Sequence, residues 1–474
     1  MMRTLILGWI FFGFSNQIWS QVITVSDEIN LKTEFLYDIL GKVGENILVV
    51  RDGVNEFDVH AFNKDMSTTW TAEEELDSRR SRIINIVPQE DRFHVVYSDE
   101  WKDTMAIKVR EYNPKVNVTF TDTLLIVKKG LIRPKFRFVK SEDRNVFLMT
   151  EVENDKIVSA FAYNLKERRL LWNGNFEFGN MNFHDEYRKT IITDDGAMYV
   201  VFEKDNFRHR KEDHSMEIFR FDQYNTIFTQ TSIPLPDFIT YDAYFKYDNI
   251  NQQLLIIGLY SDRNTGNTDG IYHALLNGNN LSDYRVTTLS YDNELIADFH
   301  GKYNPKRESL YNLDVQDLVL RQDGGVLLLA EENKEYERLA YGGRRDYYGS
   351  TRFSVDYYYE DLVLISINED GSSHWQKLLP KRQYSNDDEA VYSSYFLFKN
   401  PSYLRILYND EIRNENTVSE YILNGKGDIT RRSLMSTDNQ RLKLQIKNAI
   451  QISANQLVVP SVRGKRLKLV RLVY

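Results

Sequence analysis

The chain of 474 residues contains no cysteine, only nine prolines and 23 glycines. Without cysteine it has no disulfide bonds, no thiolate metal ligands, no cysteine nucleophile and no lipid-modified N-terminal cysteine. The scarcity of proline argues against long proline-rich linkers. The net charge of −9 gives no global reason to expect binding to nucleic acid.

Apolar and aromatic residues are plentiful. Apolar residues make up 42% of the chain and aromatic residues 13%, with 30 tyrosines and 26 phenylalanines. Such a composition permits a large buried core, and abundant aromatic side chains favour strands. The length exceeds what one compact core can use, so we expect two to four domains or one large repetitive domain.

Residues 1–20 have the features of a signal peptide. Arg3 supplies the positive charge, Leu5–Phe14 form the apolar run, and the small residue Ser20 precedes Gln21 at the expected cleavage point. The apolar run is about half as long as the roughly 20 residues that a membrane-spanning helix needs. No later segment is long or apolar enough to span a membrane. We therefore expect an exported, soluble mature chain, and export without cysteine indicates a bacterium.

Period-2 alternation dominates the rest of the chain, and convincing amphipathic helices are hard to find. Short apolar runs recur, and each is followed by a polar loop, a second strand, a turn and a third strand. These runs are Ile47–Val50, Phe93–Tyr97, Asn145–Thr150, Met198–Phe202, Leu254–Leu259, Val326–Ala330, Leu404–Tyr408 and Gln456–Val459.

The turns carry the clearest repeat. Each repeat has an Asn or Asp at the end of one strand and a large residue six to eight positions later. The pairs are Asn63 and Trp70, Asn113 and Phe120, Asn164 and Trp172, Asp222 and Phe228, Asn277 and Tyr284, Asn368 and Trp375, and Asn424 and Arg431. Asn and Asp suit this place because they tolerate the left-handed conformation and hydrogen-bond the backbone of their own turn. The large side chain can then pack against the neighbouring sheet.

The turn markers recur every 50 to 58 residues, with one separation of 91. This period, with four short strands in each unit, predicts an all-β fold, a single β-propeller of about eight four-stranded blades over residues 21–474. Seven blades are the alternative if one unit is irregular. The predicted blades are approximately 34–80, 81–130, 131–180, 186–236, 238–296, 309–382 with an insertion at 331–360, 388–436, and 442–474. The last unit has three strands, so the strand 22–31 should complete it and close the ring.

The sequence contains no motif that identifies a catalytic or cofactor site. There is no HExxH, GxSxG, GxxxxGK[ST], GxGxxG or EF-hand loop, so we expect no catalytic residues, no cofactor and no metal. His209 and His214 are the only neighbouring histidines, and we interpret their segment as a solvated charged loop. A glycosidase-like carboxylate pair could be assembled from acidic residues near strand ends, although no spacing selects two of them. The candidates are Asp99, Glu100, Glu151, Glu203, Asp262, Glu331 and Glu332.

The insertion at 331–360 is the strongest candidate for a partner-binding site. It is rich in Tyr and Arg, which protein interfaces favour, and loops of this length are often functional. Three interpretations remain open: tyrosines that pack across the strands of a hairpin, a protein contact, or stacking of sugar rings on tyrosine. The predicted contact residues are Tyr336, Tyr341, Arg344, Arg345, Tyr347, Tyr348, Arg352, Tyr357, Tyr358 and Tyr359.

Positive charge is concentrated at the C-terminal end. Residues 431–474 contain ten Lys and Arg residues against Asp438 alone. This excess predicts either docking to an acidic partner or an anionic lipid surface, or balancing by neighbours in the fold such as Asp27 and Glu28.

Three segments resemble secreted β-propellers of the Bacteroidota: YYYEDLVLISINEDGSSHWQKLLPKRQ at 357–383, DLVLRQDGGVLLLAEE at 317–332, and the final LKLVRLVY. The likeness extends over the mature chain and implies fold and lineage but no catalytic residues. Cargo of that phylum's type IX secretion system ends in a separate sorting domain, whereas here the last residues belong to the final blade. The resemblance therefore implies a periplasmic protein rather than a cell-surface one, similar to an accessory or plug-like subunit of that machinery.

Two functional hypotheses follow. The first is a non-catalytic periplasmic propeller that binds a protein partner in an envelope or secretion complex. The alternative is a carbohydrate-binding or glycan-processing propeller that uses carboxylates in the central funnel and surface tyrosines. Neither hypothesis involves nucleic acid or integration into the membrane.

Overall fold

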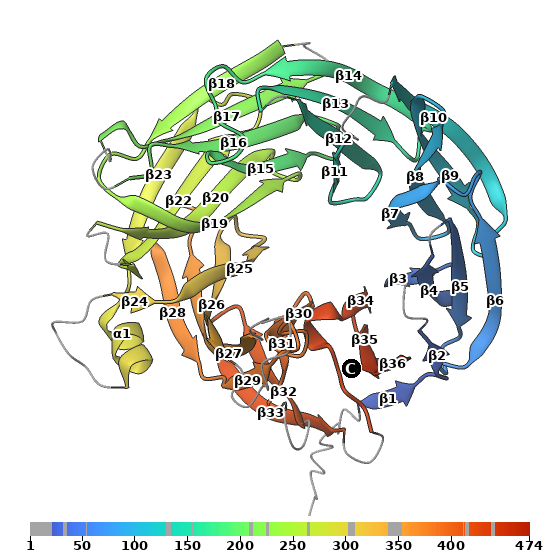
Figure 1. Cartoon of the computed structure of the whole chain (residues 1–474). Helices are drawn as coiled ribbons and strands as arrows, with labels where there is room; N and C mark the ends of the chain where they lie inside the picture. Colours follow the sequence, from blue (N-terminus) through green and yellow to red (C-terminus); the bar gives the residue numbers. More distant parts are fainter. Residues whose placement is uncertain are drawn as a thin grey trace, which may run out of the picture.

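The computed structural model arranges the strands in eight antiparallel sheets of four or five strands that follow one another around a ring, with a further two-stranded sheet beside them (Figure 1). It describes residues 21–31, 36–53, 55–128, 134–153, 155–207, 212–223, 227–262, 266–301, 309–339, 353–410, 412, 417–437 and 441–474. The predicted signal peptide lies outside the described residues. The fold is an eight-bladed β-propeller, as the turn markers predict, and not the seven-bladed alternative.

Each of the first four blades is one sheet of four strands consecutive in the sequence. Blade one contains β3 (Tyr37–Val43), β4 (Asn46–Asp52), β5 (Glu56–Phe62) and β6 (Thr68–Glu75). Blade two contains β7 (Arg82–Pro88), β8 (Phe93–Trp101), β9 (Thr104–Tyr112) and β10 (Val118–Lys128). Blade three contains β11 (Phe136–Lys140), β12 (Val146–Glu153), β13 (Ile157–Asn164) and β14 (Arg169–Glu177). Blade four contains β15 (Tyr187–Ile192), β16 (Met198–Lys204), β17 (Ser215–Asp222) and β18 (Ile227–Pro234).

Blades five to seven repeat this order, with additions between and beside them. Blade five contains β19 (Ile239–Asp248), β20 (Gln253–Ser261), β22 (Gly270–Asn277) and β23 (Tyr284–Ser290). Blade six contains β25 (Leu313–Leu320), β26 (Val326–Leu339), β27 (Phe353–Ile367) and β28 (Ser373–Leu379), with β29 (Gln383–Asn386) paired to β27. Blade seven contains β30 (Tyr395–Lys399), β31 (Tyr403–Asn409), β32 (Thr417–Asn424) and β33 (Ile429–Ser436). Between blades five and six lie the two-stranded sheet of β21 (Asn267–Thr268) and β24 (Leu310–Tyr311) and the helix α1 (Asn293–His300).

The first and the last strands that the structure describes meet in blade eight. Its strands are β34 (Ile450–Ser453), β35 (Gln456–Arg463) and β36 (Arg466–Val473), followed in space by β1 (Val22–Val25) and β2 (Ile29–Asn30), which both pair with β36; a short 3-10 helix, η3 (Ile446–Asn448), precedes β34. The register runs from Val22 opposite Val473 to Val25 opposite Val470. Between β1 and β2, the backbone N–H of Ser26 donates to the Leu469 carbonyl at 2.8 Å, and the Leu469 N–H donates to Ser26 Oγ at 2.8 Å. The prediction that the N-terminal strand closes the ring is confirmed.

The core consists of apolar clusters between neighbouring blades rather than one central core. Eight such clusters occur among the described residues, and one of them joins blade eight to blade one through Ile29, Leu467 and Phe62. The eight apolar runs found in the sequence are the second strands of their blades, which are buried on both faces. The outermost strands, such as β6 and β10, alternate between exposed and half-buried residues. Burial between two blades therefore explains why the second strands are continuously apolar.

The marker residues hold the turns between third and fourth strands through their side chains. Asn63 Oδ1 accepts the N–H groups of Asp65 and Ser67 at 2.9 and 3.0 Å. Asn113 and Asn424 make the same pair of bonds in their own turns. The left-handed conformation lies three residues after the marker rather than at the marker itself, at Met66, Val116, Gly371 and Gly427. The prediction that the marker side chain hydrogen-bonds its own turn is thus confirmed. The left-handed conformation, expected at the marker, occurs three residues later.

The three tryptophans after the markers pack against the neighbouring sheet as expected, whereas Phe228 and Tyr284 remain exposed. Trp70 contacts the cluster between blades one and two, and Trp375 the cluster between blades six and seven. Trp172 is buried between blades three and four, where its Nε1–H donates to the Gly196 carbonyl at 2.8 Å. No helix among the described residues is long and apolar enough to cross a membrane.

Candidate functional site

The predicted insertion extends two strands of blade six beyond the body of the ring. Residues 333–339 of β26 pair with residues 353–359 of β27, and β29 pairs with the other edge of β27 from Asp356 opposite Asn386 to Tyr359 opposite Gln383. We call these three segments the blade-six extension. Of the predicted contact residues, Tyr336, Tyr357, Tyr358 and Tyr359 belong to it. The other six lie outside the described residues: Tyr341, Arg344, Arg345, Tyr347, Tyr348 and Arg352.

One face of the extension carries a row of three tyrosines, one from each strand. The ring centroids of Tyr336 and Tyr358 are 5.8 Å apart, and those of Tyr358 and Tyr384 are 4.9 Å apart. Tyr358 is therefore packed between two other rings, which matches the cross-strand interpretation of the insertion. Tyr336 ends the row and keeps 56% of its surface exposed. It is the described tyrosine best placed to contact another molecule.

Polar contacts on the same face fix the strands next to this row. Arg338 Nε lies 2.6 Å from Asp356 Oδ2. The hydroxyl of Tyr384 donates to Asp356 Oδ1 at 2.6 Å, and Asn386 Nδ2 donates to the same oxygen at 2.8 Å. Asp356 thus joins all three strands of the extension. This role could not be predicted from sequence because the partners of Asp356 come from two separate segments.

A fully buried ion pair lies at the root of the extension. Lys381 Nζ is 2.7 Å from Glu331 Oε1, and both side chains have no exposed surface. Lys381 also donates to the Tyr359 carbonyl at 3.1 Å and to Gln383 Oε1 at 2.8 Å, while Ser394 Oγ donates to Glu331 Oε2 at 2.6 Å. Burial lowers the pKa of Lys381, and the charge of Glu331 opposes this shift. The pair ties β26 to the segment that follows blade six.

The segment that continues from Lys381 through β29 to β30 has an unusual backbone. Between β29 and β30, four residues other than glycine adopt positive φ: Asp387, Glu389, Ala390 and Ser394, at 51°, 55°, 53° and 65°. Such conformations cost free energy and persist only where the surroundings fix them. Ser394 is fixed by its bond to Glu331 and by Gln383 Nε2, which donates to its carbonyl at 3.3 Å.

The carboxylates proposed for a catalytic pair are dispersed over blades two to six. Several of these carboxylates form ion pairs with lysine or arginine side chains. Asp99 pairs with Lys108 at 2.9 Å, Glu203 with Arg188 at 2.7 Å, and Glu332 with Lys334 at 2.6 Å. Asp262 and Asp269 are linked by the Asp262 N–H, which donates to Asp269 Oδ2 at 3.0 Å.

Two of the candidates line cavities: Glu203 lines one of about 370 Å³ between blades four and five, together with Arg188 and Asp242, and Glu151 lines another. This cavity of about 320 Å³ lies between blades two and three and is also lined by Glu153, Phe136, Asn173 and Asn175. Burial raises the pKa of Glu151, and the charge of Glu153 raises it further. The two carboxylates share one face of β12 because they are two residues apart on a strand. They belong to the space between blades rather than to the central funnel.

His214 does not lie in a solvated loop, so that interpretation is wrong. Its ring is buried, with Nδ1 at 2.9 Å from the Phe238 carbonyl and Nε2 at 3.1 Å from Glu203 Oε1. His209 lies outside the described residues. Among the residues that the structure describes, no group of three or more His, Asp and Glu side chains could hold a metal ion.

Part of the C-terminal positive charge is balanced within the fold. Arg466 Nε lies 3.4 Å from Glu28 Oε1 across the chain closure, and Arg431 pairs with Asp410 at 2.6 Å. Arg432 and Arg405 both contact Glu420, which is buried. The interpretation based on neighbours in the fold therefore accounts for several of these cations.

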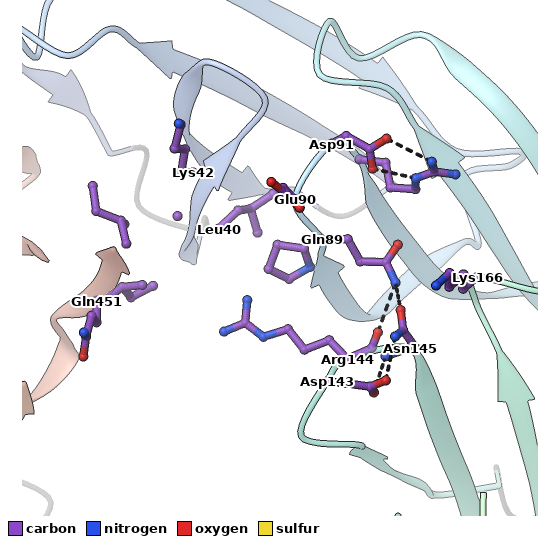
Figure 2. Close-up of a pocket in the computed structure, with 15 residues that line it drawn as sticks. Leu40, Lys42, Gln89, Glu90, Asp91, Asp143, Arg144, Asn145, Lys166 and Gln451 are labelled. Atoms are coloured by element: carbon purple, nitrogen blue, oxygen red, sulfur yellow. Dashed lines mark hydrogen bonds and ion pairs between the residues drawn. The ribbon is translucent and has the colours of Figure 1, made fainter. Parts of the chain in front are cut away.

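Another cavity, of about 550 Å³, is shown in Figure 2. Most of its wall comes from turns on the opposite face of the ring from the extension. The turns between first and second strands face this side, because consecutive strands of a blade are antiparallel. Its wall comes from four blades: Leu40 and Lys42 in blade one, residues 88–92 in blade two, residues 143–145 and Lys166 in blade three, and residues 450–452 in blade eight. Sequence reasoning missed this site because its residues come from separate turns and share no motif.

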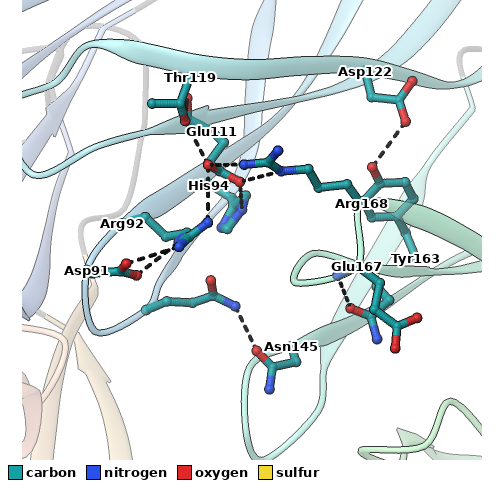
Figure 3. A network of polar contacts seen from close by, with 12 residues as sticks. Asp91, Arg92, His94, Glu111, Thr119, Asp122, Asn145, Tyr163, Glu167 and Arg168 are labelled. Carbon is teal, nitrogen blue, oxygen red and sulfur yellow. Dashed lines mark hydrogen bonds and ion pairs between the residues drawn. The ribbon is translucent and has the colours of Figure 1, made fainter.

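A buried polar network lies behind this cavity and joins blades two and three (Figure 3). Glu111 accepts hydrogen bonds from Arg168 Nη2 at 3.0 Å and Thr119 Oγ1 at 2.7 Å, and Arg92 Nη1 lies 3.4 Å away. His94 Nε2 is 3.2 Å from Glu111 Oε2. Although burial opposes its charge, the bonds from Arg168 and Thr119 hold the pKa of Glu111 at about 2.

His94 lacks a partner on its other nitrogen. Its Nδ1 is buried with no hydrogen-bond partner, so protonation there would bury an unpaired N–H group. Burial lowers the pKa of His94 to about 4. The negative charge of Glu111 opposes this shift, and the positive charges of Arg92 and Arg168 add to it. His94 is therefore neutral at pH 7 and donates from Nε2 to Glu111.

Comparisons with known proteins give fold similarity and nothing finer. No protein-family model matches the chain, and no curated protein matches it. Among solved structures, a protein of unknown function from Bacteroides caccae is 14% identical, with 73% of this chain and 94% of that chain covered and a TM-score of 0.28. The β-propeller domain of the Trilobed protease from Pyrococcus furiosus is 10% identical, with 86% and 99% covered and a TM-score of 0.39. Sqt1 from Saccharomyces cerevisiae is 10% identical, with 94% and 99% covered and a TM-score of 0.44.

Proposed function

We propose that this chain is an exported, non-catalytic β-propeller that binds a protein partner as an accessory subunit of a bacterial cell-envelope complex. The single observation that supports it most is the blade-six extension. Three strands extend from the ring, a buried ion pair anchors their root, and Tyr336 is exposed at the end of the tyrosine row.

The internal contacts of the extension favour a binding role. A surface that is ordered before binding loses little conformational freedom when a partner docks, so more of the contact energy appears as affinity. Asp356 and Lys381 supply this order through their cross-strand bonds. Tyr and Arg contribute disproportionately to protein interfaces, and here Tyr336 and Arg338 lie on the same face of β26.

The compartment and the complex are the finer part of the proposal. The predicted signal peptide at 1–20 supports export, and the likeness of residues 357–383 to secreted Bacteroidota propellers supports the envelope of that phylum. A periplasmic location and association with the type IX secretion translocon rest on these sequence features. Fractionation of cells that produce the full chain tests the compartment, and recovery in the cytosolic fraction would contradict it.

Photo-crosslinking from inside the extension tests the binding role. A photoreactive phenylalanine analogue replaces Tyr336 in the full chain, and a matched variant carries it at Tyr284, an exposed tyrosine on blade five. Crosslinked envelope proteins are then identified by mass spectrometry. We expect one dominant adduct that forms from position 336 and not from position 284. Equal adducts from both positions would contradict the proposed contact site.

A carbohydrate-processing role is the second candidate, and the cavity between blades two and three favours it. Glu151 has a raised pKa next to a second carboxylate, the combination that separates acid and base roles in glycosidases. Amide groups and a phenylalanine ring in the same wall suit a sugar. Hydrolysis of a panel of aryl glycosides that is lost in Glu151→Gln and kept in Glu100→Gln would support it. An inactive wild-type chain would exclude the hydrolase on those substrates.

A further inference from the structure

The charged side chains around the 550 Å³ cavity are unequally paired. Asp91 is held by Arg92 through two contacts, at 2.9 and 3.0 Å. Asp143 accepts from Ser141 Oγ at 2.6 Å and from Asn145 Nδ2 at 2.6 Å. These bonds hold the pKa of Asp143 below its usual value, although burial opposes the shift. Asp91 is therefore paired with a cation, whereas Asp143 stays ionised and is stabilised by neutral hydrogen-bond donors.

Three positively charged side chains in the cavity wall have no hydrogen-bond or ion-pair partner in the part of the chain that the structure describes. Among the described residues, the side chains of Lys42, Arg144 and Lys166 make no hydrogen bond or ion pair, and the only lining carboxylate in the same state is Glu90. The three cations come from two blades and three separate turns or strands. The wall therefore carries four cations, Lys42, Arg92, Arg144 and Lys166, against the carboxylates of Glu90, Asp91 and Asp143, which gives a net charge of +1.

The backbone of Arg144 is fixed while its guanidinium is free. Its φ of 61° lies in the left-handed region, which is costly for a residue other than glycine. Two blades maintain it: Gln89 Nε2 in blade two donates to the Arg144 carbonyl at 3.3 Å, and the Asp143 N–H donates to Asp194 Oδ1 in blade four at 3.1 Å. In Figure 2 the Arg144 side chain extends into the open space toward Gln451 of blade eight. The turn thus holds the Arg144 guanidinium in the cavity, where it makes no hydrogen bond or ion pair with any described residue.

A second cation, outside the cavity lining, lies within electrostatic range of Arg144. Lys140, at the end of β11, has a lowered pKa because of burial and then because of the charge of Arg144, while Asp38 opposes the shift. The two positive charges repel each other, and Asp38 offsets part of this repulsion at Lys140. An anion in the cavity would relieve that repulsion.

We propose that this cavity binds a small molecule that carries a phosphate or carboxylate group, with Arg144 as its main contact and Lys42 and Lys166 as supporting charges. Its volume is in the range of small-molecule sites rather than of a protein interface, which is broad and flat. Arginine matches the geometry of both oxyanions because its guanidinium offers two parallel donors. The site lies on the opposite face from the blade-six extension, so it does not depend on the proposed protein contact.

Calorimetric titration of the purified chain with inorganic pyrophosphate, and separately with citrate, tests the site. We expect one binding site per chain that weakens about tenfold or more in Arg144→Ala, the loss of one charge-assisted contact. Glu90→Gln should bind about two- to threefold more tightly, because a nearby negative charge is removed. Arg80→Ala removes an exposed arginine in the connection between blades one and two and should leave binding unchanged. Melting temperatures of all variants should match the wild type, since the Arg144 side chain makes no contact.

Three results would overturn the proposal. The first is no heat of binding for either anion at 50 mM salt. The second is equal affinity in wild type and Arg144→Ala, which would make the interaction a general attraction to positive surface. The third is weakening by Arg80→Ala as large as that by Arg144→Ala. Preference between pyrophosphate and citrate distinguishes a phosphate ligand from a carboxylate ligand.

Discussion

Lys381 Nζ and Glu331 Oε1 lie 2.7 Å apart with no exposed surface on either side chain, at the point where the blade-six extension leaves the ring. Removing one member of a buried pair leaves an uncompensated charge, whereas replacing both by apolar residues is often tolerated. Single and double substitutions of this pair therefore measure how much it contributes to the stability of the protein at the base of the extension.

Lys381→Met should lower the free energy of unfolding by about 3–5 kcal/mol, because Glu331 then remains buried without its partner. The double variant Glu331→Leu with Lys381→Met should recover most of that loss. Urea denaturation followed by tryptophan fluorescence measures both. Lys377→Met, at a half-exposed lysine on the outer strand of the same blade, is the control and should change stability by no more than about 0.5 kcal/mol. A double variant as unstable as the single one would contradict the account of the pair.

Acid should destabilise the protein partly through His94. Its pKa is about 4 in the folded chain and about 6.5 in the unfolded chain, so the unfolded state binds more protons between these values. The contribution of neutral His94 to the free energy of unfolding is on the order of 3 kcal/mol. It is fully present above pH 6.5 and is lost as the pH falls toward 4. His94→Gln keeps a donor for Glu111 and removes the titration, so its stability should fall less over this interval.

Stability measured by urea denaturation at pH 7, 5.5 and 4 gives the comparison. His184→Gln is the matched control, because His184 is exposed and its pKa is raised rather than lowered by its bond to Asp185. The same pH slope in wild type and His94→Gln would show that His94 is not the source.

Deletion of residues 21–31 should destabilise the whole propeller and not only blade eight. The deletion exposes the edge of β36 and removes Ile29 from the cluster between blades eight and one. We expect one cooperative thermal transition whose midpoint falls by on the order of 5 °C or more. A synthetic peptide with the sequence of residues 21–31 should restore the midpoint, and a scrambled peptide should not. An unchanged midpoint with proteolysis confined to residues 450–474 would indicate local fraying instead.

The repeat could be predicted from sequence because its determinants are local. Asn63 and its equivalents bond the turn that directly follows them, and the apolar second strands are continuous in the chain. The helix α1 escaped prediction because it is short, with Asp292 as its N-cap and Gly301 as its C-cap.

Long-range contacts explain what the sequence could not show. Glu331 and Glu203 are acidic residues near strand ends like the other candidates, and only the fold reveals that Lys381 and Arg188 neutralise them. Tyr384 lies outside the predicted insertion, yet it completes the tyrosine row through β29. The Arg144 cavity depends on segments of four blades that are close only once the ring has closed.

The most direct test of the proposed function is the affinity of the purified chain for the envelope protein that crosslinks to position 336. We expect Tyr336→Ala to weaken binding at least tenfold with an unchanged melting temperature, since the ring is exposed and ends its row. Tyr284→Ala, the matched exposed tyrosine on blade five, should remain within about twofold of the wild type. Equal affinity of Tyr336→Ala and the wild type would contradict the assignment of the blade-six extension as the partner-binding surface.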